Sequence, residues 1–196
     1  VALDWFPKWL QQLDMESNGK SVDRNGKAVK YSSPVVFGSA GSNAQHSYFQ
    51  LFHQGTEIIP IDFIAVREPM SDRPEAIAHH RILLSNCLAQ AQALANGKSA
   101  ANPNDVYPGK RPSNLLLLPK LNAFYLGALL ALYENRTATL GALWNINSFD
   151  QPGVEYGKVL AKPIEKALAS HQNDIAASAD IDAVTAARIN LLNSNN

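Results

Sequence analysis

Three titratable side chains could supply acid–base chemistry. Glu16 offers a carboxylate, His46 an imidazole that follows a loop rich in glycine and serine, and Lys158 an amine near the start of an expected helix. Such groups can give and take protons, and histidine is the side chain that titrates near neutral pH. Each also has an ordinary interpretation: a surface glutamate at a helix end, a histidine bonded to a nearby carbonyl, and a solvated lysine paired with Glu155. Residue type alone does not distinguish the catalytic interpretation from the ordinary one.

Nucleotide and metal sites find less support in the sequence. The loop 38–43 lies between an apolar run and an expected helix, which is a common way to build an anion site. It matches neither G-x-G-x-x-G nor G-x-x-x-x-G-K-[ST], so a nucleotide-binding enzyme is disfavoured. His46 and His53 are two helical turns apart, about 10 Å, which is too far for a chelating i, i+4 pair. We therefore expect no metal and no cofactor.

Three blocks of the sequence resemble one family. Residues 144–158 read WNINSFDQPGVEYGK and are similar to the C-terminal signature of glucose-6-phosphate isomerase, also called phosphoglucose isomerase. Residues 12–20, QLDMESNGK, resemble the family segment that bears its catalytic glutamate. Residues 38–46, GSAGSNAQH, and 50–56, QLFHQGT, resemble the segment that bears its catalytic histidine. The blocks follow the family's order and spacing, and the similarity extends to about residue 170.

The resemblance implies an aldose–ketose isomerase of glycolysis and gluconeogenesis that interconverts glucose 6-phosphate and fructose 6-phosphate. It assigns Glu16 to proton transfer between two carbons through an enediolate. It assigns His46 and Lys158 to opening of the sugar ring, and it places Gln12 and Gln151 against the ligand. It further implies a homodimer in which His46 acts in the site of the partner subunit.

The chain also departs from the family pattern. Ala44 stands where the family usually has glycine, and Pro152 stands where it usually has tryptophan. The family's Gly-Gly-Arg segment and its serine/threonine phosphate loop are expected upstream of this chain. We therefore expect a C-terminal portion that is inactive alone. The alternative is a non-catalytic regulatory module that binds a sugar phosphate in the same fold and needs no acid–base set.

The periodicity of apolar residues predicts the elements that must position these side chains. Helical spacing begins at Leu3 and stops at Asn18-Gly19. A tight turn at Asn25-Gly26 predicts a small hairpin. Asp72 is the expected N-cap and Gly97 the expected C-cap of a long helix. The remaining helices are expected over 44–54, 121–137, 153–168 and 182–193, the strands over 57–66 and 114–119, and either a strand or more helix over 140–148.

This alternation of strands and helices predicts an α/β fold, a parallel sheet flanked by helices. The resemblance adds that it is a three-layer domain of the sugar-isomerase (SIS) type. We expect that domain over residues 1–170 and a helical tail over residues 171–196.

Composition narrows the class of partner. The chain has 196 residues, with 17 Lys plus Arg and 17 Asp plus Glu, so its formal net charge is zero. A neutral chain has no general attraction to nucleic acid or anionic membranes. The small sugar phosphate is the partner that the resemblance implies. The single cysteine, Cys87, excludes an intrachain disulfide. No signal peptide is visible and the longest apolar run, 123–133, is too short to span a bilayer. We expect a cytoplasmic protein.

Overall fold

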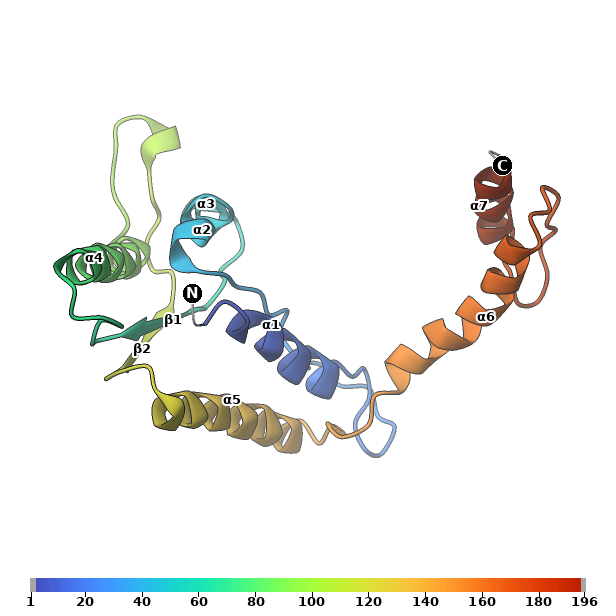
Figure 1. Ribbon diagram of the computed structural model, residues 1–196, viewed down its shortest axis with the longest axis horizontal. Helices are drawn as coiled ribbons and strands as arrows, with labels where there is room; N and C mark the ends of the chain where they lie inside the picture. The colour runs from blue at the N-terminus through green and yellow to red at the C-terminus, as the bar shows by residue number, and fades with distance from the viewer. Residues whose placement is uncertain (1–2, 195–196) are drawn as a thin grey trace. The chain divides into compact units, whose positions relative to one another are not determined.

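A computed structural model describes residues 3–194, and the chain divides into two compact units after Ile146. Figure 1 shows the elements of both. The predicted domain boundary at residue 170 falls within the second unit and stays a prediction for the whole protein. The elements of the first unit are α1 (Phe6–Gln11), a π-helical turn (Gln12–Glu16), α2 (Gly41–Gln45), α3 (Phe49–Gln54), β1 (Ile61–Val66), α4 (Pro74–Asn96), a 3₁₀ turn (Pro103–Asp105), β2 (Ser113–Leu118) and α5 (Ala123–Leu143).

The two strands confirm the predicted parallel sheet. β1 and β2 pair in parallel, with a register from Ile61 opposite Ser113 to Val66 opposite Leu118. The long helix α4 provides the crossover that a parallel pair requires. Because side chains alternate between the faces of a strand, each strand presents one set of residues to each helical layer.

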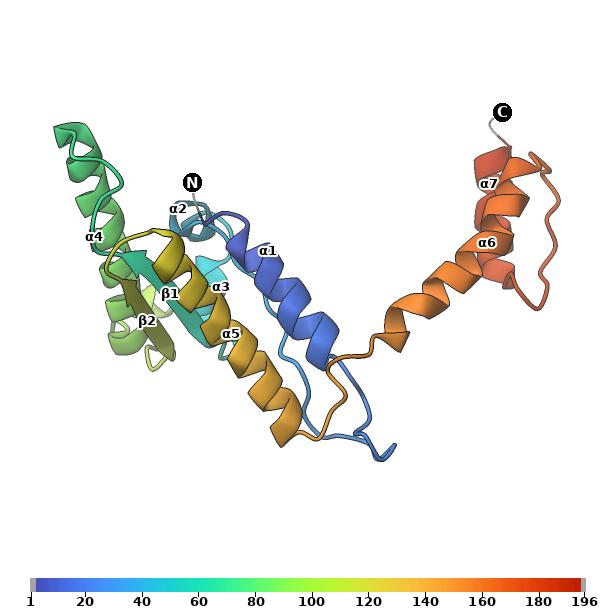
Figure 2. The same ribbon diagram turned by 60° about the horizontal axis from the view of Figure 1, so that its bottom comes forward.

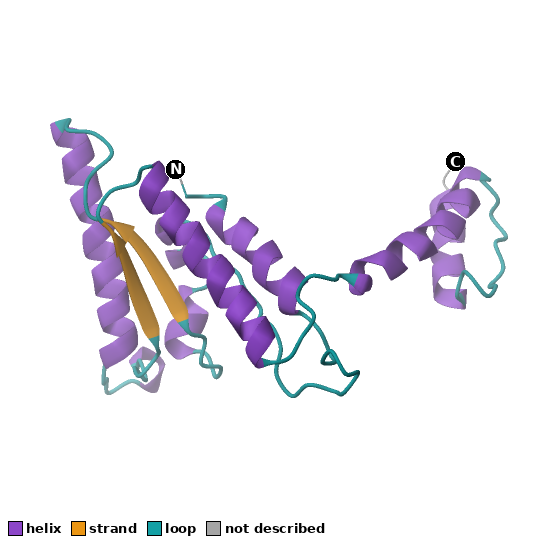
Figure 3. Cartoon of the chain, turned by 90° about the horizontal axis from the view of Figure 1, so that it is seen from below, coloured by secondary structure: helices purple, strands orange, loops and turns teal. Residues whose placement is uncertain are grey.

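Helices cover both faces of this sheet (Figure 2). On one face, α1 and α5 pack around Phe6, Leu10, Leu129 and Tyr133. On the other, α2, α3 and α4 pack around Ala44, Phe49, Phe52 and Leu94. Figure 3 shows the strands between the two helical layers. The expected three-layer arrangement is confirmed, and the segment that carries Glu16 belongs to the α1/α5 layer.

The start of α4 corrects a predicted cap. The N-cap is Arg73, not Asp72, and its side chain makes no capping hydrogen bond. Proline is favoured as the first helical residue because it has no N–H to satisfy, so Pro74 begins the helix and sets the N-cap directly before it. The predicted C-cap is confirmed: Gly97 has a φ of 66°, a conformation that glycine adopts without strain.

Two other predicted elements differ in extent. The helix expected over 44–54 is two short helices, and His46 and Tyr48 lie in the break between them. The strand expected from Glu57 begins at Ile61, because the carbonyls of Gly55 and Glu57 accept hydrogen bonds from the Arg111 guanidinium instead of from a neighbouring strand.

Two further segments also differ from their predicted structure. Helix α5 continues past the predicted end at residue 137 to Leu143, so the segment 140–148 begins as more helix. The expected hairpin is reduced to a single bridge between Val22 and Ala28. In its turn the Asp23 carboxylate accepts hydrogen bonds from the backbone of Asn25 and Lys27.

The second unit consists of two helices with their own small core. A 3₁₀ turn (Pro152–Val154) leads into α6 (Glu155–Ala169), and α7 (Ala183–Asn193) follows. Ala167 packs with Ile181, Ala186 and Ile189. The N-cap of α7 is Asp182, whose carboxylate accepts hydrogen bonds from the Val184 and Thr185 backbone, as in a standard N-cap. Among residues 3–194, no helix has the length and apolar character needed to span a membrane.

Candidate active site

Glu16 lies at the end of a widened helical turn. Helix α1 passes directly into the π-helical turn Gln12–Glu16, a rare geometry that often marks functional positions. The side chain of Gln12 donates a hydrogen bond of 3.0 Å to Glu16 Oε2. Glu16 is half-buried, and its other carboxylate oxygen accepts no hydrogen bond from residues 3–194. Two of the predicted site residues are thus in direct contact, with one oxygen of the carboxylate left available.

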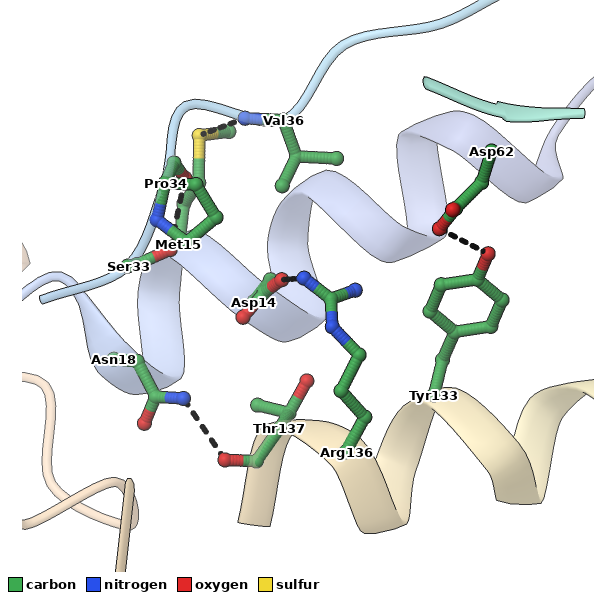
Figure 4. A network of polar contacts seen from close by, with 10 residues as sticks. All are labelled: Asp14, Met15, Asn18, Ser33, Pro34, Val36, Asp62, Tyr133, Arg136 and Thr137. Atoms are coloured by element: carbon green, nitrogen blue, oxygen red, sulfur yellow. Dashed lines mark hydrogen bonds and ion pairs between the residues drawn. The ribbon is translucent and has the colours of Figure 1, made fainter. Parts of the chain in front are cut away.

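The residues on either side of Glu16 anchor this segment to α5 (Figure 4). Asp14 is fully buried and receives an ion-paired hydrogen bond of 2.9 Å from the Arg136 guanidinium. Asn18 is also fully buried, and its amide donates to the Thr137 carbonyl at 2.9 Å. Consecutive residues of α5 therefore hold the positions two before and two after Glu16.

Burial dominates the electrostatics of Asp14. Loss of hydration raises the pKa of its carboxyl above the usual value, while the Arg136 charge and the nearby Thr137 hydroxyl act in the opposite direction. Asp14 Oδ1 and this hydroxyl lack the geometry of a hydrogen bond although both are buried. The ion pair to Arg136 is therefore the main compensation for the buried charge.

The network continues from Arg136 to the sheet. Its guanidinium lies over the Tyr133 ring, 5.5 Å from the ring centroid. The Tyr133 hydroxyl donates to Asp62 in β1 at 2.9 Å, and Asp62 also accepts from Asn114 in β2 at 2.8 Å. Burial and the neighbouring Asp62 raise the pKa of Tyr133, so this hydroxyl stays protonated as a donor.

His46 is placed differently from the other histidine of its segment. It is exposed at the C-terminal end of α2, and its ring makes no hydrogen bond to residues 3–194. His53 bonds to Gln90 at 2.8 Å and packs edge-on to Tyr107, which makes it a structural residue. The structure brings His46 into contact with neither Gln12 nor Glu16.

The other two predicted residues lie in the second unit. Lys158 is exposed in the first turns of α6 and pairs with Glu155 at 2.7 Å, which is the ordinary i, i+3 contact considered for it. The Gln151 amide donates to the Ser148 carbonyl at 3.1 Å. Both residues make their described contacts within that unit.

The two departures from the family pattern fit the local structure. The methyl group of Ala44 is buried against the aromatic cluster of Phe49 and Phe52. Pro152 occupies the first position of a 3₁₀ turn, where its missing N–H costs nothing.

Sequence reasoning missed the anchors of Glu16. Asp14 and Asn18 lie inside the recognised block, and their spacing of four residues places them on one side of a helix. That spacing signals a shared, buried face opposite Glu16. Nothing in the sequence around Arg136 and Thr137 marks them as the partners.

Comparison with known proteins identifies the family. The model of the phosphoglucose isomerase family matches residues 1–189 of the chain. The chain belongs to the phosphoglucose isomerase family. Glucose-6-phosphate isomerase 2 of Cupriavidus pinatubonensis is 53% identical over 179 residues, which cover 85% of this chain and 32% of that protein. The glucose-6-phosphate isomerase of Ralstonia nicotianae is 49% identical over 205 residues, covering 96% of this chain and 38% of that protein.

A solved structure confirms the fold assignment. The crystal structure of a glucose-6-phosphate isomerase from Chlamydia trachomatis aligns with a TM-score of 0.76 and 41% identity, over 86% of this chain and 34% of that one. The predicted SIS-type α/β fold is thereby confirmed. The chain spans about a third of the length of these relatives.

Proposed function

We propose that a full-length isomerase containing this chain interconverts glucose 6-phosphate and fructose 6-phosphate by proton transfer through an enediolate. The relatives' names supply glucose 6-phosphate, and moving its carbonyl from C1 to C2 gives fructose 6-phosphate. The observation that supports the chemistry is the state of Glu16: it is half-buried, held by neighbours on both sides, and has one oxygen without a hydrogen bond among the described residues.

Glu16 is the base in this proposal. A carboxylate on one face of the substrate can reach both C1 and C2, so a single residue takes the proton from one carbon and returns it to the other. The amide of Gln12 donates a hydrogen bond to Oε2 and so fixes the orientation of the carboxylate. The remaining oxygen is then the one directed at the carbon-bound proton. Gln12 also contacts the ligand in this scheme.

His46 and Lys158 open the sugar ring, and Gln151 contacts the ligand. The exposure of His46 suits a residue that enters the site of a partner subunit, so the active form is a homodimer. The pair between Lys158 and Glu155 is exposed, and pairs of that kind contribute little. A ligand can therefore compete for the amine at small cost. No cofactor takes part, and the reaction is placed in the cytoplasm.

The proposal is tested with the full-length isomerase in a coupled assay for conversion of glucose 6-phosphate. We expect turnover, and we expect Glu16→Gln to reduce it by at least about 10²-fold, the usual effect of losing a positioned base. The matched control is Glu75→Gln, which alters an exposed carboxylate in the first turn of α4. Binding of the sugar phosphate without conversion by the unaltered protein would instead support the regulatory module.

A further inference from the structure

The π-helical turn separates an anchored side from a reactive side. Asp14 and Asn18 are four residues apart and both are fully buried toward α5. Glu16 lies midway between them in sequence. Residues two apart on a helix do not face each other, so Glu16 projects away from α5. The burial of Glu16 agrees with this orientation, since its side chain is half-buried whereas those of Asp14 and Asn18 are fully buried.

Both anchors bind to consecutive residues of α5. Arg136 binds the Asp14 carboxylate through its side chain, and Thr137 binds the Asn18 amide through its carbonyl. The Arg136 guanidinium is itself held over the Tyr133 ring. A third tie comes from Met15, whose sulfur accepts a hydrogen bond of 3.5 Å from the Val36 backbone. These ties restrain both translation and rotation of the turn.

We propose that Arg136 is a positioning residue for the reaction, which sets the location of the Glu16 carboxylate through its ion pair with Asp14. The inference rests on the proposed function of Glu16. Arg136 itself lies on the side of the turn opposite the reactive carboxylate, and among the described residues it makes no hydrogen bond or ion pair with Glu16. Its effect on the reaction passes through the backbone of the π-helical turn.

The physical reason is the distance dependence of proton transfer. The base must lie within hydrogen-bonding reach of the proton it removes, and a displacement of about 1 Å can cost about 10²-fold in rate. A turn held at both ends cannot shift by that distance without breaking an anchor. Arg136 contributes the charged anchor, which is the stronger kind of hydrogen bond.

The test uses Arg136→Met in the full-length isomerase. We expect kcat to fall roughly 10- to 100-fold with KM nearly unchanged, because an effect on the transition state alone lowers kcat and kcat/KM together. Hydrogen exchange at C2 in heavy water should fall by the same factor, whereas interconversion of the α and β anomers should persist. Arg136→Lys keeps the charge and should recover part of kcat. Arg67→Met is the control, since the pair of Arg67 with Glu68 is exposed.

A purely structural role makes different predictions. Arg136→Met leaves the Asp14 charge buried without its partner, which can unfold the protein. The double variant Asp14→Leu/Arg136→Met removes both charges and is expected to fold, and it should show the same selective loss of C2 exchange. A folded double variant with normal C2 exchange overturns the proposal. So does a loss of exchange that merely follows the unfolded fraction. Normal turnover in Glu16→Gln would instead refute the proposed function itself.

Discussion

Replacing Glu16 with glutamine separates the two chemical steps of the proposed reaction. The substitution keeps the size of the side chain and removes its basicity. The hydrogen bond from Gln12 Nε2, 3.0 Å in the structure, can be accepted by the new amide oxygen. The anchors at Asp14 and Asn18 lie on the other side of the turn and are unchanged. A loss of rate in this variant therefore reports the loss of the base and not a displaced side chain.

The expected size of the effect follows from that geometry. Removal of a positioned general base lowers the rate roughly 10²- to 10⁴-fold. This corresponds to about 2.7–5.5 kcal/mol in the activation free energy, at about 1.36 kcal/mol for each factor of ten. The assay is deuterium incorporation at C2 of glucose 6-phosphate in heavy water. Anomer interconversion is followed in the same samples by NMR exchange.

Anomer interconversion should survive in Glu16→Gln, because ring opening needs a group that exchanges a proton with oxygen. His46→Ala should show the opposite pattern, with anomer exchange weakened more than carbon-bound exchange. Binding of the sugar phosphate and thermal unfolding serve as controls for both variants. If Glu16→Gln stays folded, binds substrate and loses both processes, the division of roles is wrong and Glu16 also takes part in ring opening.

Four further predictions concern assembly, the isolated chain, pH and stability. Mixing inactive full-length His46→Ala with inactive Glu16→Gln should restore part of the activity after subunit exchange, because a mixed dimer has one intact composite site; no recovery would contradict action across the interface. The purified chain, one third of the relatives' length, should fold but show no turnover in a coupled assay, and near-normal turnover would contradict this. Burial raises the pKa of the Asp14 carboxyl, so the stability that this group contributes is present below pH 3.8 and is lost as the pH rises through the folded-state pKa. Urea unfolding should therefore show the parent losing stability relative to Asp14→Asn over that range. A stability difference between the two proteins that does not change with pH would refute this. Tyr133→Phe keeps the edge-on contact with Phe6 and loses the bond to Asp62, so it should lower the free energy of unfolding by about 1 kcal/mol, whereas a loss above about 3 kcal/mol would implicate the ring packing.

The layers of this fold follow from patterns that the sequence displays directly. The apolar runs before Pro119 and around Phe63 are short and β-branched or leucine-rich, and the structure pairs them as β2 and β1. The end of α4 was predictable because Gly97 must adopt a positive φ there. These features depend on local preferences and periodicity, which act within a few residues.

The support of the candidate site was not predictable by the same means. The apolar spacing of Phe6, Leu10 and Leu13 fits an α-helix, and it does not show that the turn carrying Leu13 widens to a π-helical one. The ion pair of Asp14 with Arg136 spans 122 residues of sequence. A contact at that separation depends on how α5 packs against α1, so no local pattern identifies the partner.

Taken one at a time, the features of residues 12–18 each have a cost. A π-helical turn is a geometry that helices rarely adopt, and the Asp14 charge is removed from water. Both costs fall on the segment that carries Glu16, and both are offset by contacts with α5. If the segment had only to complete a helix, apolar residues at positions 14 and 18 would bury more favourably against α5. A charged and an amide anchor instead fix the turn in register and orientation, which apolar packing specifies less sharply. The chemistry of the anchors is therefore best explained by a need to hold Glu16 at a defined position. The Asp14→Leu/Arg136→Met variant tests this directly, because it keeps apolar packing against α5 and removes the ion pair that fixes the register of the turn.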